Sequence, residues 1–136
     1  MSADKTFIDT NVLIYAFTAD EPEKQAVALK YLDSCYPVIS AQVLKEFSNA
    51  IIKRGNINLG SVRKLVREIS EIAVVIEEGL TLIFSAYDIH ERYKYSFYDS
   101  LIIAAALESQ CQVLLSEHLQ SGQLIDGSLR LINPFQ

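Results

Sequence analysis

Short apolar runs alternate along this chain with longer segments of helical periodicity, and this alternation limits the folds open to it. Strands are predicted at Phe7–Ile8 and over 37–39, 73–76, 112–115 and 129–132. Helices are predicted over 11–17, 22–35, 41–54, 59–73, 79–92 and 97–109. Because strands and helices follow one another in turn, we expect a parallel sheet flanked by helices, in the α/β class.

The size and composition of the chain are those of one ordered domain. With 136 residues, 50% of them hydrophobic and 21% charged, we expect a single domain over 1–136. No apolar run reaches the ~18 residues that a membrane span needs. Residues 1–6 are polar, so we expect a cytoplasmic protein. Cys35 and Cys111 stand outside any CxxC or histidine-rich pattern, and we expect both as reduced thiols.

The net charge of −5 argues against nucleic-acid binding through a broadly basic surface. It does not exclude a nuclease, because clustered acids can hold divalent cations that reverse the local sign of the charge. Basic side chains are concentrated in the segment Lys45–Arg67. This segment is either a solvated face, which is the simpler interpretation, or part of a track for phosphates.

Four acidic residues stand at the end of a predicted strand or in an apolar predicted helix. Asp9 follows the first strand, and the carboxyl ends of parallel strands form the usual active crevice of an open α/β sheet. Glu46 lies in the helix after the second strand, and Asp99 at the start of the most apolar helix. Glu117 follows a late strand. These positions make the four acids candidates for a shared site.

Each of the four acids also has a structural explanation. Asp9 can cap the helix that follows it, and Ser96-x-x-Asp99 matches a capping box. Glu46 can be a solvated helix residue, and Glu117 lies in a Ser-Glu-His loop that is typical of a surface. Taken one at a time, none of them establishes a function.

Taken together, the acids favour a metal site. Carboxylates brought close together repel one another and lose hydration, and a hard cation with oxygen ligands, Mg²⁺ or Mn²⁺, offsets both costs. Such a cation suits phosphodiester hydrolysis, because it activates water and stabilises the charge on the leaving oxygen. Zinc is not favoured, because His90 and His118 are far apart and lack cysteine neighbours. The sequence also lacks the glycine-rich nucleotide loops and the Gly-x-Ser-x-Gly esterase motif.

The order and spacing of these acids resemble the PIN domain, and within it the VapC-type toxin ribonucleases of toxin–antitoxin pairs. Four segments carry the resemblance: Phe7–Leu13, Ser40–Phe47, Ser96–Ala106 and Leu115–Gln123. The resemblance implies a three-layer fold with a short parallel central sheet, and a metal-dependent endoribonuclease acting on RNA. The core acids and metal ligands would be Asp9, Glu46 and Asp99. Polar support would come from Thr10, Asn11 and Ser116.

The chain departs from the family's pattern at the fourth acid. After the late strand the family typically has Ser or Thr, any residue, and then Asp, whereas this chain has Ser116-Glu117-His118. Either Glu117 reaches into the site as a fourth catalytic acid, or His118 stands in its place and metal binding is weaker. The resemblance further implies a homodimer and a cognate antitoxin whose C-terminal segment lies across the active site.

Two other functions stay open on the sequence alone. A PIN-like protein with little or no activity could act as a binding module through Lys45–Arg67, and the missing fourth acid favours that alternative. The same acids could also serve a metal-dependent nuclease acting on DNA, or a phosphatase.

Overall fold

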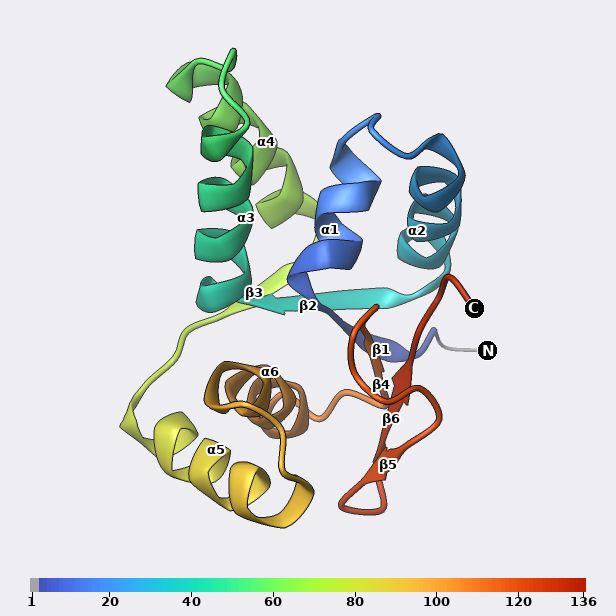
Figure 1. The fold of residues 1–136 in the computed structure, drawn as a ribbon, viewed down its shortest axis with the longest axis vertical. Coiled ribbons are helices and arrows are strands. Elements are labelled where there is room, and N and C mark those ends of the chain that lie inside the picture. Colours follow the sequence, from blue (N-terminus) through green and yellow to red (C-terminus); the bar gives the residue numbers. More distant parts are fainter. Residues whose placement is uncertain (1–2) are drawn as a thin grey trace.

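A six-stranded sheet runs through the centre of the molecule in the order β3-β2-β1-β4-β6-β5 (Figure 1). The computed structural model describes residues 3–136. The strands are β1 Lys5–Ile8, β2 Tyr36–Ser40, β3 Val74–Ile76, β4 Val113–Leu115, β5 Leu124–Ile125 and β6 Leu129–Ile132. The helices are α1 Thr10–Phe17, α2 Pro22–Ser34, α3 Ala41–Lys53, α4 Leu59–Ile72, α5 Leu80–Tyr93 and α6 Phe97–Glu108.

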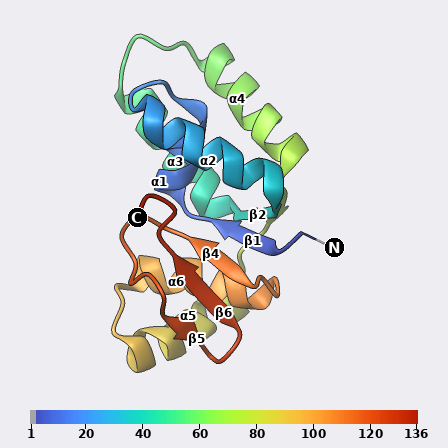
Figure 2. The same cartoon turned by 90° about the vertical axis from the view of Figure 1, so that its right-hand side faces the viewer.

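Helices cover both faces of the sheet and give three layers. In Figures 1 and 2, α1 to α4 lie on one side of the strands, and α5 and α6 lie on the other. The pairs β1–β2, β1–β4, β2–β3 and β4–β6 are parallel, with Phe7 opposite Val38 on one neighbour of β1 and Leu114 on the other. The three-layer α/β fold expected from the resemblance is confirmed.

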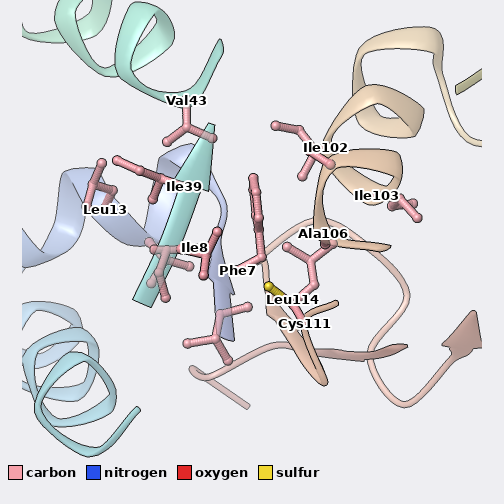
Figure 3. Close-up of a cluster of buried hydrophobic side chains, with 14 of the residues drawn as sticks. Phe7, Ile8, Leu13, Ile39, Val43, Ile102, Ile103, Ala106, Cys111 and Leu114 are labelled. Carbon is pink, nitrogen blue, oxygen red and sulfur yellow. The ribbon is translucent and has the colours of Figure 1, made fainter. Parts of the chain in front are cut away.

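The core forms because successive side chains of a strand point to opposite faces of the sheet. Figure 3 shows Phe7 on the side of Ile102 and Ala106 of α6, whereas Ile39 lies with Leu13 and Val43 on the other side. Helix α6 has no polar face: every residue from 100 to 106 is buried. Its uniform apolarity is therefore a consequence of lying between the sheet and α5.

One strand of the sheet was not predicted. The two-residue strand β5 pairs with β6 in the antiparallel direction, so the sheet is mostly rather than wholly parallel. Asp126, Gly127 and Ser128 connect the two strands, and Asp126 and Gly127 have φ of 49° and 71°. Both values lie in the left-handed region, which an Asp-Gly pair adopts readily in a tight hairpin turn. This dipeptide is the sequence signal for the hairpin.

Two further predictions concern single features. Cys35 and Cys111 are free thiols, as expected, and burial raises the pKa of both. In the part of the chain that the structure describes, none of the helices has the length and apolarity needed to cross a membrane.

Candidate active site

Asp9 is held rigidly between β1 and α1, at the carboxyl edge of the sheet. Its carboxylate is nearly buried, with the side chain 5% exposed. Oδ1 accepts a hydrogen bond from the N–H of Thr10 at 2.8 Å and so caps α1, and Oδ2 accepts one from Ser116 Oγ at 2.8 Å. Asp9 therefore caps a helix and also presents a fixed carboxylate, so the two interpretations of this residue are compatible.

Burial dominates the electrostatics of Asp9. Loss of hydration raises the pKa of this carboxyl, and the Ser116 hydrogen bond and the nearby His118 reduce that effect without cancelling it. The ionised form is thus compensated only in part by groups of this chain.

Glu46 reaches the same place from α3. The helix begins directly after β2, where Ser40 Oγ accepts from the N–H of Val43 at 3.3 Å. Thr10 Oγ1 donates to Glu46 Oε1 at 2.7 Å and so links the start of α1 to the middle of α3. Glu46 is exposed as a residue, but this hydrogen bond fixes where its carboxylate lies.

Asp99 stands in the first turn of α6, beside the imidazole of His118. Ser96 Oγ accepts from the N–H of Asp99 at 3.2 Å, as the capping-box pattern predicts. The carboxylate of Asp99 turns elsewhere: its Oδ1 lies 2.8 Å from His118 Nε2. His118 Nδ1 lies 3.7 Å from Asp9 Oδ2. The imidazole thus bridges two acids that are far apart in sequence.

The pKa of His118 reflects this position. Partial burial alone would lower the pKa, but the hydrogen bond to Asp99 and the negative charges of Asp9, Asp99 and Glu46 raise it above 6.5. A protonated His118 therefore neutralises part of the charge that the three acids bring together.

One cavity of about 330 Å³ collects most of the residues singled out from the sequence. Six of them line it: Asp9, Thr10, Asn11, Glu46, Asp99 and His118. Ser116 supports the cavity by bonding Asp9. The other lining residues are Ile14, Gln42, Ala50, Tyr98 and Ile102, which were not singled out from the sequence. Gln42 stands four residues before Glu46 on α3, so helical spacing from a predicted acid is the signal that could have found it. Tyr98 directly precedes Asp99, and adjacent helix residues do not share a face, so spacing gives no signal for Tyr98.

Glu117 does not lie with the other acids. Its Oε1 accepts from the hydroxyl of Tyr15 at 2.8 Å, and its Oε2 lies 2.5 Å from Lys24 Nζ. Partial burial would raise the pKa of Glu117, but the bonds from Lys24 and Tyr15 outweigh burial and lower it. Of the two residues considered for the fourth position, the structure brings His118 to the cavity and ties Glu117 to α1 and α2.

The donor set of the cavity fits a hard divalent cation in its chemistry. Three carboxylates and no thiolate line it, and oxygen ligands are those that Mg²⁺ and Mn²⁺ prefer. The incompletely compensated charge of Asp9 is a second reason for a cation here. Within residues 3–136, however, no three side chains of His, Cys, Asp or Glu stand in an arrangement that encloses a metal. Binding would need the acids to close further around the ion.

Comparison with known proteins identifies the family and agrees with the fold. A sequence model of the PIN domain matches residues 6–117. The fold is similar to a toxin–antitoxin complex from Klebsiella pneumoniae, with a TM-score of 0.73, 18% identity, and 96% of this chain and 98% of that chain covered. It is also similar to the Mycobacterium tuberculosis toxin VapC20, which cleaves the sarcin–ricin loop (0.65, 19% identity, 80% and 86% covered). A third similar structure is VapBC2 from Rickettsia felis bound to promoter DNA (0.68, 14% identity, 95% and 99% covered). Among curated proteins there is no match.

Proposed function

This chain belongs to the PIN-domain family, and we propose that it is a metal-dependent endoribonuclease, the toxin of a toxin–antitoxin pair. One observation carries the proposal: Asp9, Glu46 and Asp99 arrive from three different elements and line a single cavity at the carboxyl edge of the sheet. Bringing three carboxylates together in this way costs stability, and such clusters are typical of sites that bind ligands or catalyse reactions.

In this proposal Asp9, Glu46 and Asp99 hold Mg²⁺ or Mn²⁺. The bound ion would supply an activated water and stabilise the charge that develops on the phosphodiester. The chain itself prepares the ligands: Ser116 and the N–H of Thr10 fix the two oxygens of Asp9, and the Thr10 hydroxyl orients Glu46. His118 orients Asp99 through Nε2, and Asn11 adds a polar group to the rim of the cavity.

Cleavage of RNA tests the proposal directly. Single-stranded, hairpin and duplex RNAs should be incubated with the protein in Mn²⁺, in Mg²⁺ and in EDTA. We expect endonucleolytic cuts that EDTA abolishes and that Asp99→Asn reduces at least 100-fold. The matched control is Asp33→Asn, because Asp33 is an exposed residue of α2 and does not line the cavity. Failure of the wild type to cut any RNA in either metal would contradict the proposal.

A second candidate, a weakly active or inactive PIN-like binding module, is favoured by one feature: His118 bonds Asp99, and Glu117 is engaged with Lys24. Its binding surface would include the basic residues of Lys45–Arg67, which are exposed on α3 and α4. RNA retained without cleavage in Mn²⁺ would favour this module. Cleavage of DNA in preference to RNA would favour a metal-dependent DNA nuclease on the same acids.

We also propose a homodimer and an antitoxin partner. The antitoxin is supported by the likeness to the Klebsiella pneumoniae toxin–antitoxin complex over 96% of this chain. The homodimer is supported by the resemblance to VapC-type toxins in the sequence. Light scattering on the purified protein should give twice the monomer mass. A protein encoded beside this chain should copurify with it and suppress cleavage if it is the antitoxin, and unchanged cleavage in its presence would contradict that assignment.

A further inference from the structure

Gln42 holds a buried polar atom that the fold leaves without a partner. Within residues 3–136, its side-chain Nε2 is the one buried side-chain nitrogen or oxygen with no hydrogen bond. The residue is 9% exposed and lines the same cavity as the three acids. A buried donor without an acceptor costs stability, and native chains keep few of them. An unpaired amide retained at this cost therefore suggests a function outside folding.

The position of Gln42 is fixed by its backbone. It stands in the first turn of α3, where its N–H donates to the carboxylate of Glu78. Ser40 caps the same turn through the N–H of Val43. Because both contacts hold the start of the helix, the unpaired amide is not a consequence of a frayed end. Helical spacing places it on the same face as Glu46, one turn away.

A side-chain donor in this cavity would suit a phosphate. Its three carboxylates are acceptors when ionised, and an RNA phosphate also offers only acceptors. Two of the lining donors are already used inside the protein: the Thr10 hydroxyl bonds Glu46, and His118 Nε2 bonds Asp99. Gln42 lines the same cavity, and within residues 3–136 its Nε2 has no acceptor.

We propose that Gln42 contacts the substrate: its side-chain amide turns so that Nε2 faces the cavity and donates to a non-bridging oxygen of an RNA phosphodiester there. The inference rests on the proposed ribonuclease function and assigns to it a substrate-binding residue that is neither an acid nor a metal ligand. This role leads to a specific expectation for substitutions at position 42. An apolar residue of similar size at this position should suit the free protein at least as well as Gln42 does, and should bind RNA worse.

The experiment uses Gln42→Leu and Gln42→Glu in the full chain. The matched control is Gln25→Leu, because Gln25 Nε2 donates to the carbonyl of Ala16 at 3.3 Å and lies outside the cavity. Two quantities are measured for each protein: the thermal midpoint in EDTA, and the Kd for a fluorescent single-stranded RNA. The RNA is one that the wild type cuts in Mn²⁺, and binding is followed by anisotropy in Ca²⁺.

We expect Gln42→Leu to keep or raise the thermal midpoint and to weaken RNA binding about tenfold, the loss of one hydrogen bond to a charged acceptor. Gln42→Glu should weaken binding at least as much, because a carboxylate cannot donate. Gln25→Leu should lower the midpoint and leave the Kd unchanged.

The outcomes separate this inference from the function beneath it. If the wild type cuts RNA and either Gln42 variant binds it as tightly as the wild type, the inference is wrong and the ribonuclease proposal stands. A thermal midpoint of Gln42→Leu that falls as far as that of Gln25→Leu makes Gln42 a structural residue and also overturns the inference. If the wild type neither binds nor cuts any RNA, both proposals fail.

Discussion

Replacing Asp9 with Asn separates its capping role from its proposed metal-binding role. Asn keeps an oxygen that can accept from the N–H of Thr10, and it caps helices about as well as Asp. Its amide group would face Ser116, whose hydroxyl can turn to accept instead of donating. Because burial raises the pKa of Asp9, the ionised carboxylate destabilises the metal-free fold above that pKa, and the neutral amide removes this penalty. We therefore expect the free energy of unfolding of metal-free Asp9→Asn to lie within about 1 kcal/mol of the wild-type value.

Asp9→Ala removes both the helix cap and the proposed metal ligand. Removing the cap costs about 1 kcal/mol, and leaving the buried Ser116 hydroxyl without its acceptor costs about 1–3 kcal/mol. The sum, about 2–4 kcal/mol, corresponds to a fall of roughly 8–16 °C at about 4 °C per kcal/mol for a chain of this size. The two variants should thus differ clearly in thermal stability.

Thermal unfolding at pH 7.5, in EDTA and in Mn²⁺, measures both effects together. Mn²⁺ at 100 times its Kd should stabilise the wild type by about 2.7 kcal/mol, and neither variant should respond to it. The reasoning is refuted if Asp9→Asn is as unstable as Asp9→Ala, since capping would then account for the residue. It is refuted equally if Asp9→Asn retains the full Mn²⁺ shift.

Three further predictions concern Glu117, His118 and the core. Glu117→Gln should leave the Mn²⁺ shift of the thermal midpoint unchanged and lower the free energy of unfolding by at most about 1 kcal/mol. Because the pKa of Glu117 is lowered, that small contribution to stability should disappear as the pH falls through the folded pKa. Loss of the Mn²⁺ shift would place Glu117 in the site. His118→Gln should lower the thermal midpoint in EDTA at pH 6 but hardly at pH 8.5. The raised pKa of His118 gives the wild type stability that is present below pH 6.5 and is lost as the pH rises through the folded pKa. A difference in midpoint between wild type and variant that grows with pH would contradict the assigned contacts. Phe7→Ala should lower the free energy of unfolding in urea by about 3–5 kcal/mol, since Phe7 is fully buried. A loss below about 1 kcal/mol would contradict the packing of Phe7 against α6.

Much of the fold follows from the sequence because each strand and helix has a local pattern of its own. The apolar run at β1 and the uniformly apolar α6 indicate elements that are buried on both sides. Strand β5 has no such pattern, because two residues are too few to show the alternation typical of a strand. Only the Asp126-Gly127 turn indicates it. The assignment of residues 1–136 to a single domain stays a prediction.

The candidate site follows from the sequence less completely. Parallel strands present their carboxyl ends at one edge, so the positions of Asp9 and of the residues after β4 are predictable. The sequence alone does not decide between Glu117 and His118, because that depends on the direction of each side chain and on Lys24, a partner 93 positions from Glu117. Spacing from Glu46 indicates that Gln42 lies near the site. A glutamine in a helix is usually solvated, however, so only the structure shows that its amide is buried and unpaired.

The central claim is that Asp9, Glu46 and Asp99 close around one divalent cation. Anomalous diffraction from crystals soaked in Mn²⁺ tests it most directly. The account predicts an anomalous peak inside the cavity, within about 2.0–2.6 Å of oxygens from these carboxylates. A well-ordered soaked crystal with no peak between the three acids, or with its only peak elsewhere on the molecule, would contradict it.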